Sequence, residues 1–473
     1  MRVLPSLRRG WILAALALVA PEARAHLGYP DTTSVTLRRG RPEQMLVGAT
    51  FGAVMTRDGG QSWRWLCPEA LTYGSWRPET YLWQPDGTLL AATGSALIRS
   101  RDGGCTWASH PYFSPPEDRT RASWLWPISL VSPDSVPSRL WVSTGRSGAL
   151  NGVYRSDDGG ETFALTSLQS TSAVFPSIQV APSDRRRLYV SASTPTGLRL
   201  YRSEDEGGKW EEILQPFPEY TTSSRPYDFF ILKVSDTNPD RLWARVTAET
   251  WTYVLESVDG GRTFRSVVHP ENQAHDGVDE YLMGIEVSAD GDTLWAATPT
   301  RLFRVRAGVP RATLLSLPDG NACAERVGDT LFVCGASRLH DWALATTRDD
   351  GDSYTPILHL PELQPASASF CPVGTPVHDV CRSRWPQFAP TIEANPALPP
   401  DDAPDAGSGD AGTPPPDAGQ PDPGPDAGVI VEPPPPTPAP KGCAATGGVL
   451  PLAGLLALTL RRSRRAHPEN PRP

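Results

Sequence analysis

Nine residues that could bind a ligand lie in or beside segments that connect strand-like stretches of sequence. Three are arginines, whose planar guanidinium groups can hold a carboxylate or another anion. Five are aromatic, and flat rings bury area on a glycan or a peptide at little entropic cost. The ninth is a glutamate next to a tyrosine. The candidate site residues are Tyr73, Trp76, Arg77, Arg121, Trp124, Arg225, Tyr227, Glu280 and Tyr281.

Two features of the composition weaken this group as a site. Arginine makes up nearly all of the 44 basic residues, so three arginines in loops carry little weight. Trp126 would extend an aromatic platform with Trp124, but most of the 15 tryptophans are expected to pack inside the fold. Trp76 and Trp124 fit a ligand platform and internal packing equally well.

A short turn motif occurs six times and indicates how the loops are positioned. Each copy starts with Ser or Thr, contains an Asp and one or two Gly, and ends in an aromatic residue, as in S-D-D-G-G-E-T-F at 156–163. A turn Asp accepts backbone N–H bonds just downstream, and Gly supplies positive φ angles. The motif should therefore pin a hairpin and place its ring in a core. The six aspartates are Asp58, Asp102, Asp158, Asp205, Asp259 and Asp349.

The spacing of the motif predicts the number of repeats. Successive aspartates are 44 to 56 residues apart until the last pair, which is 90 apart. The long gap implies a seventh unit without the motif, following the strand-like runs 293–298 and 301–305. Short β-branched runs precede the copies, and no convincing helical period occurs between 27 and about 390. Units of about 50 residues are propeller blades in size, so we expect an all-β, seven-bladed β-propeller over 26–390.

The motifs resemble the Asp-box (BNR) repeats of sialidases, sortilin-type receptors, two-propeller endoglucanases and Ycf48-type photosystem assembly factors. The resemblance covers most of residues 27–390. It implies that each box lies between the third and fourth strands of a blade, away from the ligand face. The six aspartates would then be structural residues. A calcium site is not implied, because it needs several oxygen ligands around one ion.

The resemblance leaves an enzyme as the alternative to a binding protein. A sialidase needs three arginines, an acid and a Tyr–Glu nucleophile pair, roles that Arg77, Arg121, Arg225, Tyr281 and Glu280 could be given. However, the F-R-I-P type motif is missing. An endoglucanase uses two carboxylates across a cleft between two propellers, and this chain has residues for one. We therefore expect no catalytic residue, and a glycoside hydrolase remains the alternative.

The N-terminus predicts export. A basic segment, a short apolar core and an A-x-A site at 23–25 are typical of a cleaved secretory signal over residues 1–25. The mature chain would begin near His26. A membrane anchor is the alternative interpretation, but the apolar run is too short to favour it.

The C-terminus predicts an anchored stalk. Residues 391–440 are rich in Pro, Asp, Ala and Gly and should form a disordered, extended linker. A 17-residue apolar stretch at 444–460 precedes an Arg cluster within 441–473. This arrangement resembles the MYXO-CTERM sorting signal, which implies that Cys443 is processed and lipidated at the cell surface. An uncleaved transmembrane anchor is the alternative, and the tail H-P-E-N-P-R-P departs from the signal.

The seven cysteines of an exported chain predict disulfides with one residue left over. Spacing suggests Cys323 with Cys334 and Cys371 with Cys381. Adjacent blades could bring Cys67 and Cys105 together, which leaves Cys443. No C-x-x-C or H-E-x-x-H spacing is present, so neither a metal site nor a cofactor is expected.

The charge of the chain points away from nucleic acid. The net charge is −9, and the exported part without its two ends carries about −17. Such a protein is a poor nucleic-acid binder. We expect a surface-displayed, non-catalytic propeller, anchored to the cell envelope, that binds an extracellular glycan or protein.

Overall fold

The computed structural model describes residues 32–72, 80–118, 120, 123–214, 226–248, 251–268, 278, 282, 284–298, 301–309, 312–315 and 323–401. The chain divides into a unit of residues 1–409 and a second of 410–473, and every described residue belongs to the first. The predicted signal peptide, most of the predicted linker and the predicted C-terminal sorting segment lie outside the described residues.

Twenty-eight strands among the described residues form seven four-stranded antiparallel sheets. Within every sheet the strands follow one another in chain order. The strands are as follows: in blade 1, β1 (Thr32–Arg38), β2 (Arg41–Ala49), β3 (Gly52–Thr56) and β4 (Arg64–Leu66); in blade 2, β5 (Thr80–Trp83), β6 (Leu89–Ala92), β7 (Leu97–Ser100) and β8 (Ala108–Ser109); in blade 3, β9 (Pro127–Val131), β10 (Leu140–Thr144), β11 (Asn151–Ser156) and β12 (Ala164–Ser170); in blade 4, β13 (Val174–Ala181), β14 (Asp184–Thr194), β15 (Gly197–Ser203) and β16 (Glu211–Leu214); in blade 5, β17 (Asp228–Val234), β18 (Leu242–Ala248), β19 (Trp251–Ser257) and β20 (Arg265–Ser266); in blade 6, β21 (Gly284–Val287), β22 (Thr293–Ala297), β23 (Leu302–Arg306) and β24 (Thr313–Leu314); in blade 7, β25 (Ala324–Val327), β26 (Thr330–Cys334), β27 (Leu344–Thr347) and β28 (Thr355–Leu358).

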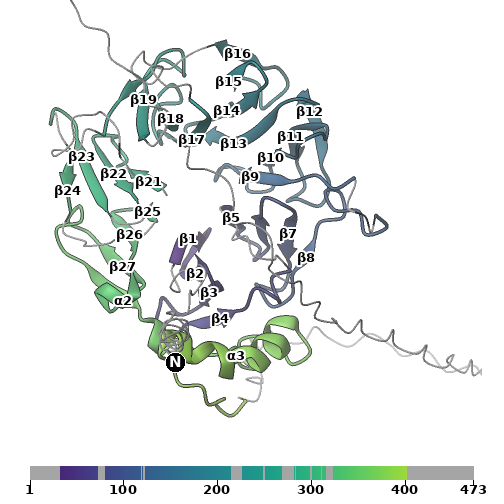
Figure 1. The fold of residues 1–473 in the computed structure, drawn as a ribbon, viewed down its shortest axis with the longest axis vertical. Helices are drawn as coiled ribbons and strands as arrows, with labels where there is room; N and C mark the ends of the chain where they lie inside the picture. The colour runs from purple at the N-terminus through teal and green to yellow at the C-terminus, as the bar shows by residue number, and fades with distance from the viewer. Residues whose placement is uncertain are drawn as a thin grey trace, which may run out of the picture. The chain divides into compact units, whose positions relative to one another are not determined.

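The sheets are the blades of a propeller. The first strands of neighbouring blades contact one another around the axis, and Figure 1 shows the fourth strands at the periphery. The predicted all-β, seven-bladed propeller is confirmed. The unit without a motif is blade 6, which contains the runs 293–298 and 301–305 and does not follow them. Helices contribute little: a one-turn α2 (Ser337–His340) and a C-terminal helical segment.

Each box is the turn between the third and fourth strands, as blade 2 shows. Asp102 Oδ1 accepts hydrogen bonds from Ser100 Oγ (2.7 Å) and from the backbone N of Cys105 (3.0 Å) and Thr106 (2.9 Å), while Gly104 N donates to Ser100 Oγ (2.9 Å). Burial raises the pKa of Asp102, but bonds from Ser100 and Thr106 outweigh it and hold that pKa below its usual value. The same pattern holds Asp58, Asp158, Asp205, Asp259 and Asp349.

The ring that ends each box packs against the preceding blade. Trp63 of blade 1 donates its Nε1–H to Ile357 O of blade 7 (2.7 Å). Phe264 of blade 5 shares a buried cluster with Leu200 of blade 4. The corresponding residues of the other marked blades are Trp107, Phe163, Trp210 and Tyr354. The box therefore joins blades as well as closing a turn.

Blade 6 retains the length of the box turn without its chemistry. Glu256 pairs with Arg265 across the blade 5 turn, and Arg304 pairs with Thr313 across the blade 6 turn, with the same number of residues between. By this register the positions of Ser257, Asp259 and Phe264 are taken by Val305, Ala307 and Ala312. The hydroxyl, the carboxylate and the ring are all absent from blade 6.

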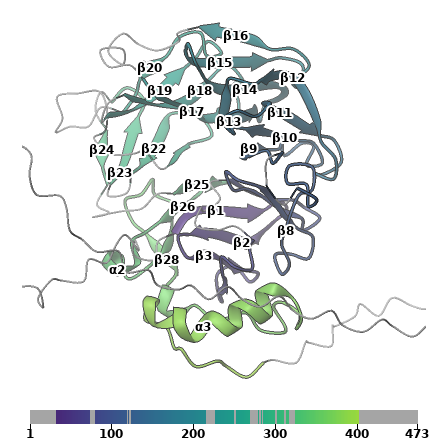
Figure 2. The ribbon, with the colours of Figure 1, turned by 45° about the vertical axis from the view of Figure 1, so that its right-hand side comes forward.

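A C-terminal helical segment follows β28 and returns to blade 1. It consists of η2 (Leu360–Glu362), the π-helical turn η3 (Val377–Cys381), α3 (Arg382–Phe388) and η4 (Ala389–Ile392). Figures 1 and 2 show α3 beside the first blade. Trp65 N donates to Gln364 O (3.0 Å), and the Trp65 ring stacks on Phe388 at 4.0 Å between centroids. The sequence predicts no helix before about residue 390, and that expectation is wrong here.

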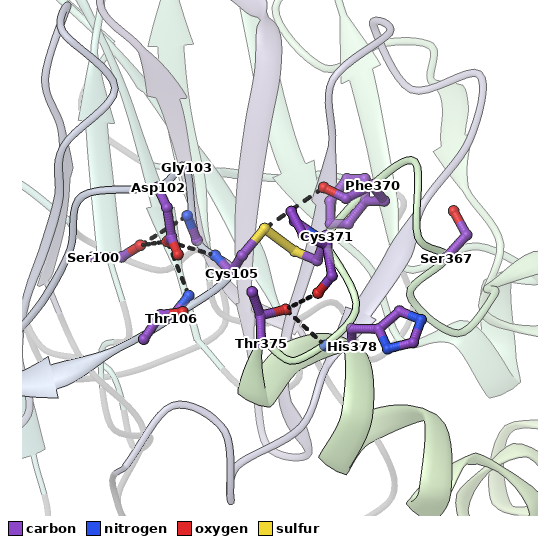
Figure 3. Close-up of a disulfide and its surroundings, with 12 residues drawn as sticks. Ser100, Asp102, Gly103, Cys105, Thr106, Ser367, Phe370, Cys371, Thr375 and His378 are labelled. Carbon is purple, nitrogen blue, oxygen red and sulfur yellow. Dashed lines mark hydrogen bonds between the residues drawn. A yellow bond between two sulfur atoms is a disulfide. The ribbon is translucent and has the colours of Figure 1, made fainter. Parts of the chain in front are cut away.

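Two disulfides fix this segment and correct the predicted pairing. Cys67 of blade 1 is bonded to Cys381, and Cys105 of the blade 2 box is bonded to Cys371 (Figure 3). The predicted Cys67–Cys105 and Cys371–Cys381 pairs are wrong, because the helical segment lies against both blades and presents one cysteine to each. The predicted Cys323–Cys334 disulfide is confirmed.

Contacts of the propeller unit continue beyond residue 390. Asp401 accepts a hydrogen bond from Ala368 N (3.0 Å), and its other carboxylate oxygen lies 2.9 Å from His378 Nε2. His378 Nδ1 is 2.6 Å from Asp379. The stretch that follows the helical segment is thus tied back to it.

We expect loss of the Cys105–Cys371 disulfide to destabilise the propeller substantially. The bond spans 266 residues. Because the Cys67–Cys381 bond stays closed, its removal frees a loop of about 50 residues and should cost about 4 kcal/mol in unfolding free energy on the chain-entropy account. The double variant Cys105→Ser/Cys371→Ser, unfolded with guanidinium without reductant, measures this. Amide exchange in β3 and β4 should also accelerate.

The matched control is Cys323→Ser/Cys334→Ser, which opens a bond spanning only 11 residues within blade 7. It should cost less and leave exchange in β3 and β4 unchanged. Equal exchange in both double variants would contradict a specific role of the helical segment in holding blades 1 and 2.

Candidate functional site

Seven of the nine predicted ligand residues lie outside the described residues, so their convergence stays a prediction. They are Tyr73, Trp76, Arg77, Arg121, Arg225, Glu280 and Tyr281. Trp124 and Tyr227 are described, together with their neighbours Trp126 and Asp228.

Trp124 and Trp126 precede β9 and are held by a loop of blade 3. Arg146, in the β10–β11 turn, donates from Nη1 to Trp124 O (2.5 Å), and Gly145 N donates to Trp126 O (3.0 Å). The Arg146 guanidinium lies 5.7 Å from the centre of the Trp126 ring. Trp126 is 41% exposed, and it is the exposed tryptophan among the described residues. We call these two side chains the Trp126–Arg146 pair.

Tyr227 lies in a different blade. Its side chain is 62% exposed, and its N–H donates to Thr247 O (3.1 Å) at the start of blade 5. The next residue, Asp228, forms an ion pair with Arg245 at 2.9 Å. Within the described residues no ring contact joins Tyr227 to Trp126, so the predicted platform consists of two separate parts there.

Three charged residues that sequence reasoning missed lie on the innermost strands of blades 5, 6 and 7. Lys233 of β17 pairs with Glu286 of β21, whose carboxylate also accepts a bond from Val287 N (2.8 Å). Burial lowers the pKa of Lys233, but Glu286 and Glu325 outweigh it, and that pKa is raised. No motif marks these residues, because each is a single charge within a short strand.

Glu325 of β25 completes this group near the propeller axis. Its side chain reaches solvent, but the surrounding protein removes much of its hydration. This desolvation, together with repulsion from Glu286, raises the pKa of Glu325 to about 8, although Lys233 acts in the opposite direction. The two glutamates thus differ in environment, since Glu286 is buried in an ion pair and the pKa of Glu325 is raised.

A groove of about 420 Å³ lies between blades 5 and 6, on the side of the box turns. We call it the blade 5–6 groove. Its apolar wall is formed by Trp243, Val267, Leu294 and Val305, and its charged wall by Arg241, Glu256, Arg265 and Arg306. The sequence analysis did not identify this groove as a site. The sequence feature that could have indicated it is the doubled spacing between Asp259 and Asp349, which marks the blade that lacks a box.

The described residues contain no cluster of three His, Cys, Asp or Glu side chains that could hold a metal ion. None of the helices in the described ranges has the length and apolar character needed to cross a membrane. The predicted anchor at 444–460 and Cys443 lie outside those ranges.

No family model matches the chain. Among curated proteins, a xyloglucanase of Hypocrea jecorina (strain QM6a) is 36% identical over 123 residues, which are 26% of this chain and 13% of that enzyme. The chain therefore matches only a small part of this relative's length.

Solved structures resemble the chain in fold. YCF48 from Cyanidioschyzon merolae is 14% identical with a TM-score of 0.45, over 67% of this chain and 95% of that one. A GH74 xyloglucanase from Xanthomonas campestris is 15% identical with a TM-score of 0.42, over 68% and 60%. A puromycin hydrolase is 12% identical with a TM-score of 0.48, over 70% and 53%. We transfer no residue roles from these structures.

We expect Glu325→Gln to change the pH dependence of stability. The folded pKa of about 8 exceeds the value of about 4.3 in an unfolded chain. Between these values the folded protein keeps a proton that the unfolded chain releases, so stability falls as pH rises through this window. Glutamine cannot titrate, so the variant should match the wild type near pH 4.5 and exceed it at pH 9.

Urea denaturation at pH 4.5, 7 and 9 measures this difference in unfolding free energy. The matched control is Glu117→Gln, at an exposed glutamate in the connection between blades 2 and 3. It should leave the unfolding free energy unchanged at both pH 4.5 and pH 9. A difference between Glu325→Gln and the wild type that does not depend on pH would contradict the assigned protonation.

Proposed function

We propose that this chain is a surface-displayed, non-catalytic β-propeller that binds an extracellular glycan or protein. The Trp126–Arg146 pair carries this proposal. An exposed indole beside a guanidinium offers an apolar face and hydrogen-bond donors together, which suits a sugar ring or a peptide. Both residues belong to connections held by backbone hydrogen bonds, so little order must be gained on binding.

Display at the cell surface is part of the proposal. The signal-like residues 1–25, the acidic Pro-rich linker and the C-terminal segment with Cys443 support it. Three disulfides within the propeller unit are in keeping with an oxidising compartment.

A second candidate function is hydrolysis of a xyloglucan-like β-glucan. The 123-residue similarity to a xyloglucanase favours this substrate class over others. Among the described residues, Glu325 would be the protonated acid, because its pKa is raised to about 8, and Glu286 would be the neighbouring carboxylate. Glycoside hydrolysis needs such a pair in different protonation states.

We expect Trp126→Ala to weaken ligand binding tenfold or more, because a buried indole is a frequent source of binding energy. The full-length chain is tested on a glycan array that includes xyloglucan oligosaccharides, and hydrolysis of the same sugars is followed in parallel. The matched control is Tyr112→Leu, at an aromatic residue of similar exposure (43%) that packs on Phe113 and Phe163 instead.

Binding that Trp126→Ala weakens and Tyr112→Leu does not, without turnover, would support the proposal. Turnover of xyloglucan that Glu325→Gln abolishes would replace it with the hydrolase. Binding that is insensitive to Trp126→Ala would place the ligand elsewhere and overturn the assigned site.

A further inference from the structure

The junction between blades 5 and 6 differs from the other described junctions in what fills it. Elsewhere a box ring packs between its own blade and the preceding one, as Phe264 does against blade 4. In blade 6 the equivalent position is Ala312, which joins the apolar cluster of Trp243 and Leu294 but is far smaller than a ring. The blade 5–6 groove lies at this junction.

A tryptophan side chain in the groove lacks the hydrogen bond made by its counterparts. At the same position of the second strand, Trp141 donates to Glu206 O (3.1 Å), Tyr189 to Pro239 O (2.7 Å) and Trp295 to Asp350 O (2.9 Å). Each acceptor is a backbone carbonyl of the following blade. Trp243 is 2% exposed and lines the groove, yet no acceptor for its indole N–H is found among the described residues.

The indole N–H of Trp243 is therefore open to an acceptor that a ligand brings into the groove. The groove therefore offers a ligand two interactions. A ligand carbonyl could accept a hydrogen bond from the Trp243 indole N–H, and an apolar group could fill the space beside Val267, Leu294 and Val305. In the junctions between blades 3 and 4 and between blades 6 and 7, the box turn of the following blade makes both contacts. The fold itself thus supplies a template for the missing occupant.

The charged side chains of the groove indicate which residue type should flank the aromatic side chain of the occupant. Glu256 is 3% exposed and is held by Arg241 Nε (2.8 Å) and Arg265 Nη2 (2.6 Å). Arg306 pairs with Asp350 at 3.1 Å, and the exposed Asp292 also lines the groove. Arg265 remains 73% exposed and is the most open positive charge at the rim, so a carboxylate beside the entering ring could pair with it.

We infer that the blade 5–6 groove binds a peptide segment of a partner protein, in which an aromatic side chain is flanked by a carboxylate. A sugar is the poorer fit. Stacking of a sugar needs an open aromatic face, whereas Trp243 is buried and the Arg241 guanidinium lies over its ring at 5.0 Å. This second site goes beyond the proposed function, since it uses blades 5 and 6 and not the Trp126–Arg146 pair.

The test uses a peptide of known sequence in place of the unidentified partner. Thr56–Trp63 of this chain, T-R-D-G-G-Q-S-W, carries the turn and the ring that fill a sibling junction, together with one aspartate. Calorimetric titration of the full-length chain with this peptide, blocked at both ends, should give saturable one-to-one binding. A peptide with Ala in place of its Trp should not bind, and one with Asn in place of its Asp should bind more weakly.

Three protein variants locate the binding. Trp243→Phe removes the donor together with part of the ring and should weaken binding at least tenfold, and Arg265→Glu should reverse the preference for the Asp peptide over the Asn peptide. Ala312→Phe restores the ring within the chain and should abolish binding. Trp141→Phe makes the same chemical change where a box is present, so it should leave binding unchanged even if it lowers stability.

The proposal is overturned if the peptide does not bind, or if it binds equally to the wild type, Trp243→Phe and Ala312→Phe. It is also overturned if a glycan binds and Trp243→Phe abolishes that binding while the peptide has no affinity. Loss of glycan binding in Trp126→Ala with peptide binding intact would separate the two sites.

Discussion

The propeller depends on how its ring is closed. Every blade is built from four consecutive strands, so blades 7 and 1 share no strand across the ends of the chain. The junction relies on contacts such as Thr32 Oγ1 to Ala343 O (2.7 Å) and Trp63 to Ile357 O. Two disulfides then bind the C-terminal helical segment to blades 1 and 2. Because these bonds span hundreds of residues, they restrict the unfolded chain far more than a local cross-link does.

Ring closure holds the connecting loops in fixed positions, which favours binding. The connections that lead into successive blades come from distant parts of the sequence, and a closed ring fixes their relative positions. A site such as the Trp126–Arg146 pair can then be held by a few backbone bonds without further support. Binding at a pre-ordered surface loses less conformational entropy than binding at a mobile one. The helical segment, bonded to blades 1 and 2, supports this rigidity.

The repeated junctions explain why one altered turn produces a local groove and leaves the ring intact. Ala307 N still donates to Asp292 O (2.7 Å), and β23 and β24 keep their register. Arg241 is anchored by Glu256 and by Gly291 O (2.7 Å), so the blade 5 side cannot simply collapse into the space. Interiors this well connected leave a gap where a side chain is lost, since surrounding atoms relax only in part.

Features that depend on residues close together in the chain could be predicted from the sequence. The box turns and the seven units follow from residues within a few positions of one another, such as Thr56, Asp58 and Ser62. The disulfide pairing depends on where a distant segment lies, and spacing cannot report that. The helical segment escapes detection because Pro386 and Pro390 interrupt its period, and burial of Trp385 stabilises it instead. The doubled gap predicts the unmarked blade, but only the packing of Trp243 reveals what that blade lacks.

Salt screening determines how an acidic peptide can approach the acidic propeller and reach the blade 5–6 groove. The box aspartates and the net charge of −9 create a field that opposes an acidic peptide approaching the propeller. Such a field reaches about 30 Å at 0.01 M salt but only about 8 Å at physiological ionic strength. Within that shorter range the exposed guanidinium group of Arg265 is the most accessible positive charge at the groove, since Arg306 is paired with Asp350. Screening therefore removes the long-range repulsion first, and Arg265 then favours a peptide that carries a carboxylate.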